Sequence, residues 1–163
     1  MLKKDAGRVC RVLLAEDNPS DIAILEQVVR TKKNRFQLEV VTDGEQALAF
    51  LRKQPPWHST WRPDLVVLNI NMPKANGWEV LKEMKSDPDL CFLPVAMWTV
   101  AQEDHGDYAT RAFEMGCSGG FSKPVGSVRM QAQVKAMLEF YWWAWFYPCE
   151  VKRDAGRTRC AKN

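Results

Sequence analysis

The sequence predicts an α/β fold in which five parallel strands form one doubly wound sheet in the order 2-1-3-4-5. Segments with strand-like apolar runs alternate along the whole chain with segments that have helical spacing of apolar residues. The Leu-Val-Val-Leu run at residues 65–68 is apolar at every position, as expected for a central strand that helices cover on both faces. Polar residues follow several of these runs, at the sheet edge where open α/β folds bind ligands.

The N-terminal part of the sequence is predicted to form a strand at residues 9–15, a helix at 19–31, an edge strand at 36–41 and a second helix at 45–53. The first strand is an apolar run, and Asn18 or Ser20 caps the helix that follows it, with Pro19 tolerated in the first turn. The third segment alternates in polarity, as an edge strand does. The second helix stops before Pro55 and Pro56.

The C-terminal part of the sequence continues the alternation of strands and helices. Strands are predicted at residues 65–68, 94–99 and 119–122, and helices at residues 77–86, 102–115 and 127–147. Asp87 and Pro88 close the helix that follows the central strand. The fifth strand is short and rich in glycine. Ser127 is the expected cap of the last helix, which runs through several aromatic residues and ends at Pro148.

Length and composition favour one domain. A chain of 163 residues with 46% hydrophobic residues fills one core. We expect a domain at residues 8–148, a short extension at 1–7, and a polar, basic, disordered tail at 149–163. The 23 basic residues are spread among 20 acidic ones, and the net charge of +3 does not indicate nucleic-acid binding.

The sequence also predicts a cytoplasmic protein without a membrane span. No apolar signal core follows the first residues, and no stretch reaches the roughly 20 apolar residues that a membrane helix needs. The five cysteines are odd in number and form no Cys-x-x-Cys pair, so free thiols are expected.

The predicted topology brings the carboxyl ends of four strands together, with Glu16 and Asp17 after the first, Asn69 after the third, Thr99 at the fourth and Lys123 after the fifth. These residues occur in the order and spacing that are typical of one protein family. The chain resembles the receiver domain of two-component response regulators over residues 9–147, and the resemblance also rests on the segments 63–68 and 71–73, on Gly77 and on Pro124. Residues 62–85, 87–88 and 139–140 are most similar to the stand-alone receivers associated with bacterial phytochromes.

The resemblance implies a flavodoxin-like fold in which the acidic pair and an aspartate after the third strand bind Mg²⁺, and that aspartate accepts a phosphoryl group from a histidine kinase. Asn69 stands at the aspartate's position. A carboxylate attacks phosphorus to give an acyl phosphate, whereas a neutral amide offers no comparable nucleophile. Only weak Mg²⁺ binding by Glu16, Asp17 and Asn71 is expected, and no cofactor is required.

Other positions also depart from the family pattern. The family places an aromatic residue three positions before the lysine, where it couples to the threonine, and Gly120 stands there. Phe121 is one position along and is expected on the opposite side of the strand. Val100 is branched where the family prefers a small residue. We therefore expect Thr99 to be a simple strand-end residue rather than a switch, and Lys123 to pair with Asp17.

The last helix carries aromatic residues on more than one face, and we predict that they form a protein interface. They are Tyr141, Trp142, Trp143, Trp145 and Phe146. A homodimer through this helix would cover them. Interfacial membrane binding is disfavoured because the polar face is not basic.

These observations favour a pseudo-receiver, a single-domain response-regulator-like module that binds other proteins without phosphorylation and is not an enzyme. A sensor histidine kinase or a photoreceptor is a further candidate partner. One alternative is a phosphoacceptor receiver in which the aspartate was exchanged for asparagine by engineering, although Gly120 and Val100 argue against it. The other is a flavodoxin-like cofactor carrier, which the acidic loop after the first strand disfavours because it would repel phosphate.

Overall fold

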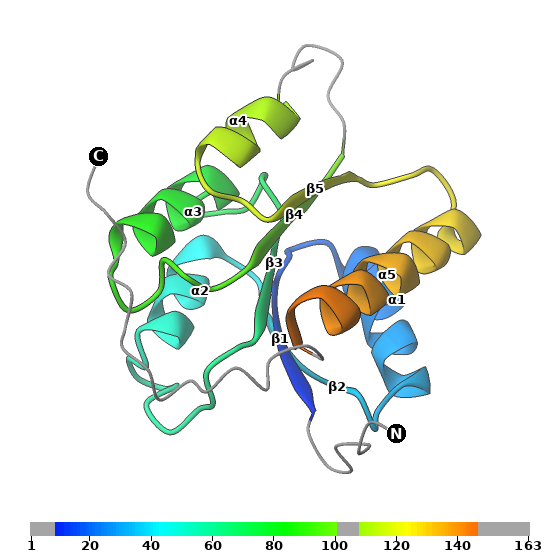
Figure 1. Cartoon of the computed structure of the whole chain (residues 1–163), viewed down its shortest axis with the longest axis horizontal. Coiled ribbons are helices and arrows are strands. Elements are labelled where there is room, and N and C mark those ends of the chain that lie inside the picture. Colours follow the sequence, from blue (N-terminus) through cyan, green and yellow to red (C-terminus); the bar gives the residue numbers. More distant parts are fainter. Residues whose placement is uncertain (1–8, 101–107, 147–163) are drawn as a thin grey trace.

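The computed structural model describes residues 9–100 and 108–146, except for the side chains of residues 145 and 146. Its five strands are all parallel and lie in the order β2-β1-β3-β4-β5, as predicted. They are β1 (Cys10–Ala15), β2 (Phe36–Val41), β3 (Leu65–Leu68), β4 (Val95–Thr99) and β5 (Gly119–Ser122). Figure 1 shows the sheet with β3 at its centre.

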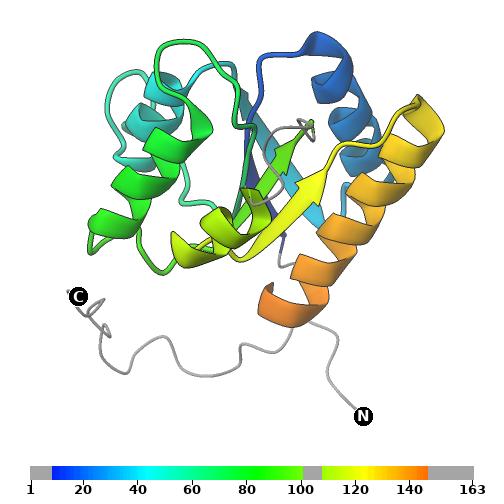
Figure 2. The ribbon, with the colours of Figure 1, turned by 90° about the horizontal axis from the view of Figure 1, so that it is seen from above.

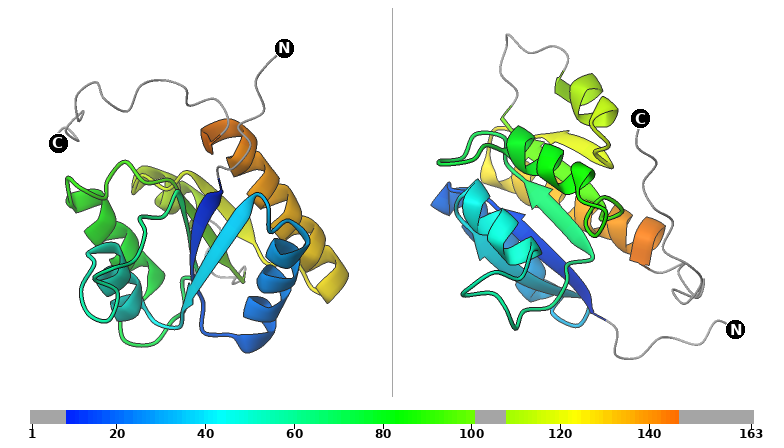
Figure 3. Two further views of the ribbon diagram at one scale, coloured as in Figure 1. Left: turned by 90° about the horizontal axis from the view of Figure 1, so that it is seen from below. Right: turned by 90° about the vertical axis from the view of Figure 1, so that its left-hand side faces the viewer.

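The helices form a layer on each face of the sheet, so the fold has two apolar cores. The helices are α1 (Pro19–Thr31), α2 (Gly44–Leu51), α3 (Gly77–Ser86), α4 (Tyr108–Glu114) and α5 (Ser127–Tyr141), followed by the π-helix η1 (Trp142–Phe146). The pair α1 and α5 covers one face, and α2, α3 and α4 cover the other (Figures 2 and 3). Every residue of β3 is buried, which explains its unbroken apolar run.

Side-chain caps fix where three of the helices begin, and Asp43 caps α2 by accepting from the backbone of Gln46. Asn18 accepts hydrogen bonds from the backbone of Ser20 and Asp21 at the start of α1, and Asn76 forms a capping box with Glu79 at the start of α3. The prediction that Ser127 caps α5 is wrong. Gly126 occupies that position, with φ of 95°, and makes no side-chain capping bond.

The end of the last helix folds back onto its own domain more than the sequence predicted. Tyr141 is only 1% exposed and packs in the core between the sheet and α1. The Trp142 ring is half-buried and lies 5.6 Å from the ring of Phe36. The prediction of an interface residue is therefore wrong for Tyr141, whereas Trp143 is 52% exposed. The side chains of Trp145 and Phe146 lie outside the described part of the structure.

Two further expectations can be compared with the described residues. None of their helices has the length and apolar character needed to cross a membrane. Cys91 takes part in a disulfide, so the expectation of free thiols is wrong for this residue.

Candidate functional site

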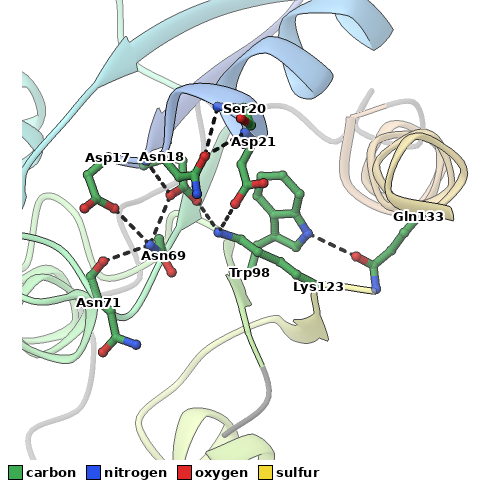
Figure 4. A network of polar contacts seen from close by, with 10 residues as sticks. Asp17, Asn18, Ser20, Asp21, Asn69, Asn71, Trp98, Lys123 and Gln133 are labelled. Atoms are coloured by element: carbon green, nitrogen blue, oxygen red, sulfur yellow. Dashed lines mark hydrogen bonds and ion pairs between the residues drawn. The ribbon is translucent and has the colours of Figure 1, made fainter. Parts of the chain in front are cut away.

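The carboxyl ends of the strands form a polar pocket around Asn69. Glu16 and Asp17 follow β1, Asn69 follows β3 and Lys123 follows β5, so the topology brings these residues to one edge of the sheet. Figure 4 shows the network that they form together with Asp21 of α1. Glu16 is fully buried and Asn69 is 7% exposed, so this network is mostly shielded from water.

The Asn69 amide nitrogen is the donor at the centre of the pocket. It donates to Oε1 of Glu16 at 3.1 Å and to Oδ1 of Asp17 at 3.2 Å. It also donates to the backbone carbonyl of Asn71 at 2.8 Å. An aspartate here would replace the shared donor with a charged oxygen facing two other carboxylates. Asn69 therefore joins the acidic side chains where a carboxylate would repel them.

Lys123 is the cation of the pocket, and its side chain is only 3% exposed. Its ammonium lies 2.5 Å from Oε2 of Glu16 and 2.8 Å from Oδ2 of Asp21. The prediction that Lys123 pairs with Asp17 is wrong, because Asp21 reaches into the pocket from the first turn of α1. The backbone N–H of Lys123 donates to the carbonyl of Thr99 at 2.7 Å, which fixes the lysine beside the end of β4.

Asp21 was missed because an acidic residue in the first turn of a helix has an ordinary explanation in the helix dipole. One signal was present in the sequence. Asp21 lies in the first turn of α1, and that turn directly follows the acidic pair at the end of β1. An acidic residue at this position, opposite the lysine after β5, could have been named as a second partner of that lysine.

Both oxygens of Glu16 already accept hydrogen bonds. Oε1 accepts from Asn69 and, at 3.0 Å, from the backbone of Asn18, and Oε2 accepts from Lys123. Burial raises the pKa of Glu16, and Lys123 offsets only part of this effect. The carboxylate is held in place by its partners rather than by solvent.

As arranged, these residues do not fit a divalent cation site. Mg²⁺ requires several oxygen ligands at about 2.0 to 2.1 Å in octahedral geometry. Here the nitrogen of Asn69, and not its oxygen, faces Glu16 and Asp17. Within residues 9–100 and 108–146 no group of three or more His, Cys, Asp or Glu side chains is placed to hold a metal. Weak Mg²⁺ binding remains a prediction.

The remaining predicted positions lie around β4 and β5. Thr99 ends β4, is 3% exposed and pairs with Ser122. Gly120 lies in β5, and Phe121 packs into the core on the α1 and α5 side, as expected from strand alternation. Val100 is 59% exposed beyond the strand.

Comparison with known proteins agrees with this geometry. The response regulator receiver domain family matches residues 12–135, which cover the sheet, the pocket and part of α5. The chain belongs to the response regulator receiver domain family. Receiver domains are signalling modules of two-component systems, and the flavodoxin-like order of the strands agrees with this membership.

The relatives of this receiver include phytochrome-associated proteins. Response regulator Rcp1 of Synechocystis is 34% identical over 106 residues, which are 65% of this chain and 72% of Rcp1. The structure of the phosphorylated cyanobacterial phytochrome response regulator RcpA is similar with a TM-score of 0.77 and 28% identity, covering 84% of this chain and 96% of that one. Mn²⁺-bound Rcp1 gives a TM-score of 0.74 and 29% identity, covering 82% and 94%.

Proposed function

We propose that this protein is a pseudo-receiver, a signalling module that binds its partners without aspartyl phosphorylation and catalyses no reaction. One observation carries the proposal. At the position where the family resemblance places the phosphoacceptor, the Asn69 amide donates to both acidic side chains of the pocket. This side chain stabilises the pocket in a form that needs neither a phosphoryl group nor a metal.

The contacts of Lys123 support the same proposal. In a phosphorylated pocket, a lysine would serve as the cation beside the added negative charge. Here its ammonium is shared by Glu16 and Asp21, and its side chain is nearly inaccessible to water. Recruiting Lys123 to another anion would leave Glu16 buried without a charged partner, which is costly.

The kind of partner follows from the relatives. RcpA is described as a phytochrome response regulator, and Rcp1 is similar to this chain in sequence and in fold. A sensor histidine kinase or a photoreceptor of the phytochrome type is therefore the partner that we propose. In that complex the pseudo-receiver would act by binding alone.

The decisive experiment is an attempt to phosphorylate the protein. Acetyl phosphate with Mg²⁺ should leave its intact mass unchanged, because Asn69 has no nucleophilic oxygen comparable with a carboxylate. A phosphorylatable receiver treated in parallel controls for the reagent. A stoichiometric, hydroxylamine-labile gain of one phosphoryl group would contradict the proposal and would indicate that Asp17 or another carboxylate accepts the group.

We further propose a homodimer through the end of α5. Phe140 near the end of α5 and Trp143 in η1 lie three residues apart and are 54% and 52% exposed. A second copy of the chain offers the same two rings, so a twofold arrangement pairs each patch with itself. About half of each side chain remains exposed, and exposed aromatic side chains are effective anchors of protein interfaces.

Sedimentation of the full chain at micromolar concentration should therefore show a dimer. The double variant Phe140→Ser with Trp143→Ser should sediment as a monomer, because four exposed rings are lost from the symmetric interface. Phe113→Ser is the matched control, since Phe113 is 79% exposed on α4. A monomeric wild-type protein would refute the homodimer without affecting the proposal about Asn69.

A further inference from the structure

We propose that Tyr108 of α4 takes the place of the aromatic side chain missing at Gly120 and couples the acidic pocket to α4. The first observation is steric. A Cβ atom at Gly120 would lie 3.5 Å from Cε2 of Tyr108 and 3.9 Å from its hydroxyl oxygen. The Tyr108 side chain thus lies directly over Gly120, although it comes from a helix and not from the strand.

The second observation is that Tyr108 is bonded to the strand. Its hydroxyl lies 2.8 Å from Oγ of Ser122, two residues after Gly120 and on the same side of β5. Ser122 immediately precedes Lys123 and pairs with Thr99 of β4. Tyr108 is therefore attached to the segment of β5 that leads into the pocket.

The third observation is that Ser122 also connects to the opposite face of the sheet. Its carbonyl accepts a 2.7 Å hydrogen bond from Nε2 of Gln133 on α5. Oε1 of the same amide accepts a 3.0 Å bond from the indole nitrogen of Trp98. Gln133 thus holds β5 and β4 together through both ends of one side chain, and Figure 4 shows its contact with Trp98.

Trp98 completes the connection to the pocket. Its ring is fully buried, and the ammonium of Lys123 lies 4.8 Å from the ring centroid, within the range of a cation–π interaction. A change at the partners of Lys123 therefore alters the contact with Trp98, then the Gln133 amide, and finally the segment that holds Tyr108. Each step is a direct contact between described residues.

Helix α4 is suited to respond because it is short. It has seven residues, and Ala112 is its buried residue. The guanidinium of Arg111 lies 4.4 Å from the Trp78 ring, and the Tyr108 hydroxyl provides the polar attachment to β5. Loss of one hydrogen bond at such a helix should increase its local opening measurably.

Amide hydrogen exchange of α4 tests the proposal on the intact protein. Tyr108→Phe, which removes only the hydroxyl, should speed exchange at residues 112–115 by roughly two- to tenfold. Gln133→Ala should act in the same direction. Gln131→Ala is the matched control, because Gln131 lies on the same helix but bonds to Gln27. Amides of α3 report global opening and should be unchanged.

The coupling itself is tested by a change in the pocket. Asp21→Asn removes one charged partner of Lys123 and should speed exchange in α4 at least about twofold. In the Tyr108→Phe background the same change should add nothing. If Asp21→Asn leaves α4 unaffected, or if the two effects multiply, the proposal is overturned. Asn69→Ser is a second pocket variant. It should also speed exchange in α4, and it should add nothing in the Tyr108→Phe background. None of these readouts depends on phosphorylation, so the proposal can fail independently of the proposed function.

Discussion

Lys123→Met should lower the free energy of unfolding by about 3 to 5 kcal/mol at neutral pH, the usual cost of removing one partner from a buried ion pair. The reason is that Glu16 is fully buried, and its Oε2 is 2.5 Å from the ammonium of Lys123. Without Lys123, this carboxylate would keep only neutral donors. Urea unfolding followed by tryptophan fluorescence measures the loss.

The expected loss depends on pH in a defined direction. Burial already raises the pKa of Glu16, and removing Lys123 raises it further. A carboxyl whose pKa is higher in the folded state than in the unfolded state contributes most to stability at low pH, and this contribution is lost as the pH rises above the unfolded pKa. The deficit of Lys123→Met should therefore be smallest near pH 4 to 5 and largest at neutral pH.

Two comparisons separate this effect from a general loss of packing. Arg30→Met breaks a surface ion pair with Glu26, in which the Arg30 side chain is 78% exposed, and should cost less than about 1 kcal/mol. Adding Glu16→Gln to Lys123→Met should recover part of the stability, because no uncompensated charge then remains buried. Equal losses for Lys123→Met and Arg30→Met would show that the buried pair does not stabilise the fold.

The order of the strands and the position of the pocket were predictable because both depend on simple patterns. An apolar run such as residues 65–68 has to be buried on both faces, and parallel strands place their carboxyl ends at one edge. Topology alone therefore places Asn69, Thr99 and Lys123 near one another. Predicting this proximity requires no knowledge of side-chain conformation.

The partners of these residues were not predictable in the same way. Lys123 bonds to Asp21 rather than Asp17 because of where the first turn of α1 lies relative to the end of β5, a distance that no sequence spacing gives. The replacement of an aromatic residue at Gly120 by Tyr108 likewise depends on how α4 packs against the sheet. The burial of Tyr141 depends on the position of α5 over β5.

Asn69→Asp should make the stability of the protein depend on Mg²⁺. Without the cation, the new carboxylate loses the amide contacts to Glu16 and Asp17, which lie at 3.1 and 3.2 Å, and repels both. Hydrogen bonds to charged groups are worth about 1.5 to 3 kcal/mol, so a loss of about 3 kcal/mol is expected. Urea unfolding without Mg²⁺ measures it.

Adding Mg²⁺ should reverse this loss in the variant and stabilise the wild-type protein much less, because only weak Mg²⁺ binding is predicted there. A third carboxylate supplies both the charge and the oxygen that the cation needs, and a cation that binds only the folded state stabilises it by about 2.7 kcal/mol at one hundred times its Kd. Ca²⁺ at the same concentration tests the preference for a small octahedral ion. If Mg²⁺ stabilises the wild-type protein as much as the variant, the Asn69 amide does not prevent metal binding, because its oxygen must then be able to turn toward the cation. Such a result would remove the argument that Asn69 stabilises the pocket in a form that needs no metal.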